Sequence, residues 1–164
     1  MKIFFLLLLF CFGCAKNPDP HLVQLQMRSM QTRSYAHQTV KGIIKEIVNV
    51  LQDEGYIVRN INPELGVLTA EKSVDIEKFS SVFWAYIFSG RQGSWKKQSI
   101  VEMTTNISQF QDVVRVRTTF QLKILDNFGR VVKIHPIAEE KYYQAFFDKV
   151  QKGVLTQLSL KQTN

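Results

Sequence analysis

Apolar residues recur with helical spacing in two stretches of the chain. The first stripe follows a 3.6-residue period through Val40, Ile43, Ile44, Ile47, Val48 and Leu51. Such a stripe predicts an amphipathic helix with one face toward a core, and Gly55 is placed to end it in a left-handed cap. A second stripe predicts a last helix over about residues 138–161, through Tyr143, Phe146, Phe147, Val150, Val154 and Leu158.

Between these helices, apolar and polar residues alternate as they do in strands. In residues 113–124 every second side chain is apolar or Thr, and residues 99–107 alternate in the same way. We expect the two stretches to pair as a long hairpin through residues 109–112. Shorter extended stretches are predicted at residues 28–35, 56–61, 67–72 and 131–134, with turn sequences at Asn62–Gly66 and Asp126–Gly129.

These elements predict an α+β fold built from two layers. An antiparallel sheet of about five or six strands with one apolar face needs a cover on that face. The two amphipathic helices supply it, and the other face of the sheet meets solvent. We expect residues 28–164 to form this single domain.

The N-terminus has the pattern of an export signal. Lys2 precedes an unbroken apolar run over Ile3–Phe12, and Gly13-Cys14 follows. The run is shorter than the roughly 20 residues that span a bilayer. We therefore expect residues 1–13 to be a lipoprotein signal peptide, Cys14 to receive the lipid, and residues 14–27 to be a lipidated tether. An ordinary secretory signal with incidental cysteines is the alternative.

Lipidation at Cys14 fixes several other expectations. Cys11 would leave with the signal peptide and Cys14 would become a thioether, so no thiolate would remain for catalysis or for zinc. Acyl chains anchor a protein stably at a bilayer. Ala15 rather than Asp follows the cysteine. By the sorting rule of enterobacterial lipoproteins, this favours the outer membrane, with the domain facing the periplasm.

Charge and chemistry motifs add little to this picture. The net charge is +7, but Lys and Arg are scattered, as on an ordinary solvated surface or one that contacts anionic lipid or cell-wall polymer. The histidines lack ligand spacing: His21, His37 and His135. Ser80-Ser81, Gly90–Gly93 and the pair Glu139-Glu140 match no catalytic or phosphate-binding motif. We expect no enzyme activity, no cofactor, no metal and no nucleic-acid partner.

The run Val82–Phe88 is the strongest candidate for contact with a partner. It holds seven apolar or aromatic residues without a charge. It is either a buried core segment or a patch that meets a membrane interface or an envelope protein. The candidate contact residues are Phe83, Trp84, Tyr86, Phe88 and Trp95.

Several stretches resemble a family of small proteobacterial envelope lipoproteins. They are Gln31-Thr32-Arg33, the helix end Leu51–Tyr56, Leu65-Gly66-Val67 with Lys72, and Tyr143–Val150. The resemblance covers nearly all of the chain after Cys14 and implies no catalytic residue. At the level of fold, the plan is also similar to lipoproteins that accompany outer-membrane barrel assembly, an analogy that transfers no function.

The sequence therefore predicts a lipid-anchored, non-enzymatic interaction module. Two alternatives remain open. One is a structural subunit of an envelope-spanning secretion or pilus complex. The other is a small-ligand or cell-wall-binding lipoprotein, which a cavity lined by Trp84, Tyr86 or Trp95 would favour.

Overall fold

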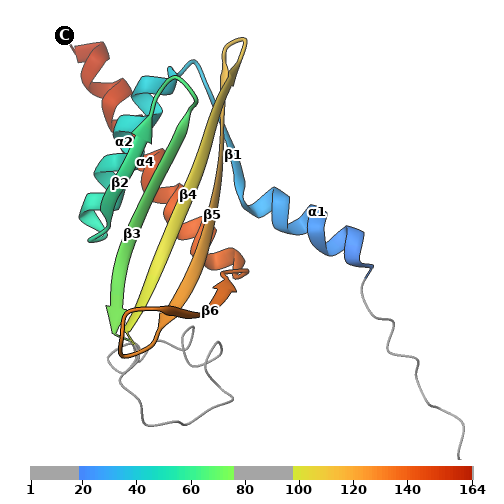
Figure 1. The fold of residues 1–164 in the computed structure, drawn as a ribbon. Coiled ribbons are helices and arrows are strands. Elements are labelled where there is room, and N and C mark those ends of the chain that lie inside the picture. The colour runs from blue at the N-terminus through green and yellow to red at the C-terminus, as the bar shows by residue number, and fades with distance from the viewer. Residues whose placement is uncertain (1–18, 76–97, 164) are drawn as a thin grey trace, which may run out of the picture.

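The computed structural model describes residues 19–75 and 98–163, and it confirms the predicted two-layer α+β fold (Figure 1). Within these residues, six strands form one antiparallel sheet and three helices accompany it. In chain order the elements are α1 (Pro20–Met30), β1 (Thr32–Ala36), α2 (Val40–Asp53), β2 (Ile57–Asn62), β3 (Val67–Asp75), β4 (Gln98–Phe110), β5 (Val113–Leu125), β6 (Val131–Pro136) and α4 (Glu140–Thr163).

The long hairpin of β4 and β5 forms the centre of the sheet. The strand order is β1-β5-β4-β3-β2, and β6 also pairs with β5. Phe110 pairs with Val113, so Gln111 and Asp112 make a tight turn in which Gln111 has a φ of 51°. The predicted strands are all present, and β3, β4 and β6 extend beyond their predicted ends.

Helices α2 and α4 cover one face of the sheet, as their apolar stripes require (Figure 1). Thr39 caps the start of α2 through its side chain, which accepts a hydrogen bond from the Gly42 amide. Gly55 follows the helix with a φ of 78°, the left-handed conformation expected of a cap. The largest fully buried side chains come from both layers: Ile43, Ile47, Leu51, Leu68, Met103, Leu122, Tyr143 and Phe147.

Strand β5 changes its edge partner part-way along its length. β1 pairs with residues 113–117 of β5, whereas β6 pairs with residues 121–125. Between them, the Thr118 amide donates to the Gln31 carbonyl (2.9 Å), and the Phe120 carbonyl accepts from the Ile137 amide (3.0 Å). The Phe120 amide donates to the hydroxyl of Tyr143 (3.3 Å). Every one of these β5 groups therefore finds a partner outside the strands.

The region before the sheet differs from its prediction. Residues 14–27 are predicted to be a tether and residues 28–35 an extended stretch, but α1 occupies Pro20–Met30 and the strand begins only at Thr32. Asp19 caps α1 by accepting a hydrogen bond from the His21 amide (2.9 Å). Pro20 takes the first helical position, where an amide N–H would have no partner within the helix, so proline loses no hydrogen bond there. The proline therefore starts this helix.

Candidate functional site

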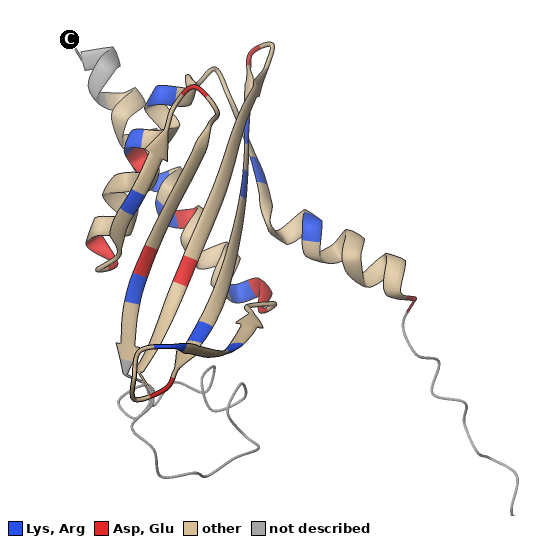
Figure 2. Ribbon diagram, viewed as in Figure 1, with Lys and Arg blue, Asp and Glu red and all other residues tan. Residues whose placement is uncertain are grey.

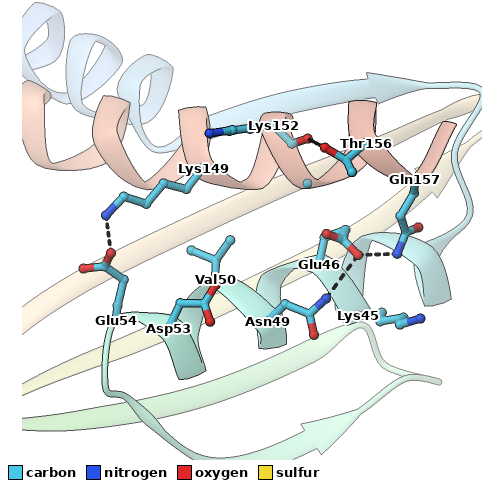
Figure 3. Close-up of a pocket in the computed structure, with 11 residues that line it drawn as sticks. Lys45, Glu46, Asn49, Val50, Asp53, Glu54, Lys149, Lys152, Thr156 and Gln157 are labelled. Carbon is cyan, nitrogen blue, oxygen red and sulfur yellow. Dashed lines mark hydrogen bonds and ion pairs between the residues drawn. The ribbon is translucent and has the colours of Figure 1, made fainter. Parts of the chain in front are cut away.

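A polar groove runs between α2 and α4 on the side of the helices away from the sheet (Figure 3). Its volume is about 620 Å³. The lining residues are Lys45, Glu46, Asn49, Val50, Asp53, Glu54, Lys149, Lys152, Gly153, Thr156 and Gln157. They include three carboxylates and three lysines, but no histidine or cysteine. The groove thus presents hydrogen-bonding groups of both charges to whatever enters it.

Glu46 is the most unusual residue of this groove. Only 5% of it is exposed, although it lies outside the apolar stripe of α2. Its Oε1 accepts hydrogen bonds from the side-chain amides of Asn49 (3.3 Å) and Gln157. Within the described residues no lysine or arginine forms an ion pair with it. A buried carboxylate held by amides is a fixed hydrogen-bond acceptor.

Gly153 explains how a carboxylate fits between the two helices. A side chain at this position would overlap the Oε2 atom of Glu46. Glycine in a helix interior costs about 1 kcal/mol relative to alanine. Gly153 interrupts the apolar stripe of α4, and Glu46 approaches α4 at this position.

One ion pair bridges the groove at its other end. Lys149 of α4 pairs with Glu54, the residue that caps α2. Both side chains are substantially exposed, so the pair contributes little stability. Lys45, Asp53 and Lys152 are exposed and surround the groove (Figure 3). These charges are available to a partner with complementary groups.

A smaller crevice of about 90 Å³ lies beside the groove, against the sheet. There the hydroxyls of Tyr56 and Tyr142 are 2.7 Å apart. Burial raises the pKa of both phenols above the ordinary value, so both stay protonated even at a pH at which a free phenol ionises. Lys72 lies over the ring of Tyr56, with its Nζ 5.7 Å from the ring centroid. The crevice contains hydroxyl donors and apolar walls.

The open face of the sheet carries charged residues on several strands (Figure 2), and it also exposes apolar side chains such as Ile57 and Ile134 near its edges. Its exposed side chains include Thr104, Asn106, Ser108, Arg115, Arg117 and Thr119. Farther along, Lys123 and Gln121 both donate to Glu102. Burial alone would raise the pKa of Glu102, but these donors hold that pKa below its usual value.

All the residues predicted to be lipidated or to contact a partner lie outside the described part of the chain: Cys14, Phe83, Trp84, Tyr86, Phe88 and Trp95. Ser80-Ser81 and Gly90–Gly93, which match no catalytic or phosphate-binding motif, also lie outside it. Of the histidines, His21 lies on α1, His37 precedes α2, and His135 lies on β6. Glu140 occupies the first turn of α4, where a carboxylate suits the helix dipole. The sequence alone does not indicate the groove, because Glu46 and Gly153 belong to different helices and are far apart in sequence.

The fold and the groove define a class: a small two-layer α+β domain with a polar groove between its helices. In residues 19–75 and 98–163, no cluster of three or more His, Cys, Asp or Glu side chains could hold a metal ion. No helix within the same residues is long and apolar enough to cross a bilayer. In comparisons with known proteins, no family model matches the chain, and no curated protein matches it significantly.

Proposed function

We propose that the chain is a lipid-anchored interaction module of the bacterial outer membrane, facing the periplasm and without enzyme activity. The observation that carries this proposal is the order of segments along the chain. An apolar run that follows Lys2 ends at Gly13-Cys14, and a folded domain follows from Pro20 onward. The anchor keeps the domain near the membrane, and the groove between α2 and α4 supplies a place for an envelope protein to bind.

The groove suits a protein partner because of its chemistry. Its carboxylates, lysines and side-chain amides match the mixed polar surfaces found at the rims of protein interfaces. Glu46 is fixed by Asn49 and Gln157 and adds a directional acceptor. An extended or helical segment that carries a lysine or arginine would complement Asp53, the exposed carboxylate of the groove. A structural subunit of a secretion or pilus complex would use the same surface but stay bound at fixed stoichiometry.

Replacing Cys14 with serine is expected to abolish anchoring while leaving the fold intact, because the serine hydroxyl cannot form the thioether. Intact-mass measurement should give a diacylglyceryl-modified N-terminus at residue 14 for the unchanged chain and none for Cys14→Ser. Membrane fractionation should move the variant from the outer membrane to the periplasmic extract, with an unchanged circular dichroism spectrum. An unmodified wild-type N-terminus would refute the proposal.

A photo-crosslinking amino acid at Lys152, on the wall of the groove, is expected to capture an envelope protein in intact cells. The matched control places it at Asn106 on the open sheet face, where the side chain is also exposed. Capture at Lys152 but not at Asn106 supports the groove as the docking surface. Equal capture at both positions, or none at either, argues against it. Mass spectrometry of the captured band identifies the partner and its stoichiometry.

A further inference from the structure

One end of the open sheet face carries two arginines that no carboxylate neutralises. Arg115 and Arg117 are exposed and alternate with buried residues of β5, so both side chains stand on the open face. Within the described part of the chain, neither forms an ion pair. The adjoining strand segments 32–36, 104–110 and 113–119 contain no Asp or Glu. This end of the face is therefore positively charged.

Elsewhere on the same face, cations lie opposite acids. Arg59 pairs with Glu71, and Lys123 pairs with Glu102. Figure 2 shows acidic residues on β3 and β4 in the half of the sheet that lies away from the β4–β5 turn. Opposite charges on neighbouring strands stabilise a sheet. Arg115 lacks such a partner, as does Arg117, so both are available to an anion from outside the domain.

Uncharged hydroxyl and amide side chains surround the two arginines. The register of β5 with β1 and β4 places four of them directly beside Arg115 and Arg117: Thr32, Ser34, Asn106 and Ser108. Thr104 and Thr119 form the next cross-strand pair on this face. Hydroxyl and amide groups both donate and accept hydrogen bonds. The surface thus combines two positive charges with a larger number of neutral hydrogen-bonding groups.

Phe110 adds an aromatic ring at the outer end of this surface. It is 75% exposed, and the alternation along β4 places it on the same face as Ser108 and Asn106. Its cross-strand neighbour Val113 is 39% exposed. A ring exposed to this degree adds little to the core, and its face can pack against a ligand. We call the surface formed by Arg115, Arg117, Phe110 and the four neutral neighbours of the arginines the arginine patch.

The composition of the arginine patch distinguishes between anionic partners. Duplex DNA is typically held through about 6–10 phosphate contacts, and single strands by basic grooves with aromatic side chains for successive bases. Anionic lipid attracts clusters of about 4–8 cations. The patch has two arginines and one aromatic ring among mostly neutral polar groups. It matches a ligand that is rich in hydroxyls, has sparse acidic groups and presents apolar ring faces, which is an acidic polysaccharide.

We propose that the arginine patch binds an acidic polysaccharide. The guanidinium groups of Arg115 and Arg117 pair with its carboxylates through two parallel hydrogen bonds each. The neutral side chains bond its hydroxyls, and Phe110 packs against the face of a sugar ring. The patch lies on the opposite face of the sheet from α2 and α4, so it can be occupied while the groove holds a protein. This binding does not depend on the lipid anchor.

The test measures binding of a hyaluronan hexasaccharide, which has a carboxylate on every second sugar, by isothermal titration calorimetry. The protein is the full chain with Cys14→Ser. A chitin hexasaccharide supplies sugars without carboxylates, and inorganic tripolyphosphate supplies negative charge without sugars. Arg115→Gln/Arg117→Gln removes both charges of the patch, and Phe110→Ala removes the ring. The matched control Arg59→Gln/Arg130→Gln removes two charges from exposed arginines that already pair with carboxylates. Circular dichroism verifies the fold of each variant.

The inference predicts that the hyaluronan hexasaccharide binds and that the chitin hexasaccharide and tripolyphosphate bind much more weakly. The Arg115→Gln/Arg117→Gln chain should bind the hyaluronan hexasaccharide at least about tenfold more weakly. Phe110→Ala should weaken binding about three- to tenfold, and the control variant should stay within about twofold of the unchanged chain.

Three results would overturn the inference and leave the proposed function standing. They are no binding of the hyaluronan hexasaccharide, equal or tighter binding of tripolyphosphate, and an equal loss of affinity in the control variant, which would mean that only net charge matters. Capture of an envelope protein by the photo-crosslinker at Asn106 would assign this face to a protein and would overturn the inference as well.

Discussion

Replacing Gly66 with alanine is expected to destabilise the domain by about 2–5 kcal/mol, through backbone strain and overpacking. Gly66 has a φ of 64°, a conformation that L-residues adopt at a cost. A Cβ at this position would also overlap the carbonyl oxygen of Ile107, a backbone atom of β4. The Ile107 amide donates to the Gly66 carbonyl (2.7 Å), so the two segments cannot separate without losing that bond.

Gly129 provides the matched control for this prediction. It has a φ of 77°, but a Cβ there would meet no atom within 4 Å. Gly129→Ala therefore tests the backbone strain alone, which is about 1–2 kcal/mol. Urea unfolding, followed by circular dichroism in a chain that carries Cys14→Ser, gives both free energies of unfolding. Equal losses for the two variants would show that the Gly66–Ile107 contact has no energetic role.

Replacing Tyr143 with phenylalanine is expected to cost about 2–4 kcal/mol, because the change leaves buried backbone groups without partners. The Tyr143 hydroxyl donates to the Ile137 carbonyl (2.8 Å) and accepts from the Phe120 amide (3.3 Å). Tyr143 is fully buried, so water cannot replace the hydroxyl. This hydroxyl satisfies the β5 amide at the point where β1 has ended and β6 has not begun.

Tyr35→Phe is the control, since Tyr35 is also buried but its hydroxyl has no hydrogen-bond partner among the described residues. Burial raises the pKa of Tyr35 to about 12, which keeps the phenol neutral. Removal of an unpaired buried hydroxyl should be neutral, or stabilise the domain by up to about 1 kcal/mol. The same unfolding measurement applies. A destabilisation of Tyr35→Phe as large as that of Tyr143→Phe would contradict the proposed role of the hydrogen bonds.

Sequence patterns were sufficient to predict the helices and strands in which apolar side chains recur with a clear period. The stripe from Val40 to Leu51 and the alternation along β5 each state which face is buried, and Gly55 marks a helix end through its own conformational freedom. These are local properties of the chain. The fold class followed from them, because a one-sided sheet and two one-sided helices bury their apolar faces best together.

Only the tertiary structure decided the residues whose surroundings come from distant parts of the chain. Pro20 is consistent with a linker or with the first position of a helix, and the Asp19 cap makes it the latter. Glu46 is buried because Gly153, on another helix, leaves room for it. Tyr143 is a hydrogen-bonding residue because β5 changes partners beside it. Periodicity reports which way a side chain points, but burial and hydrogen bonding depend on what the fold places opposite it.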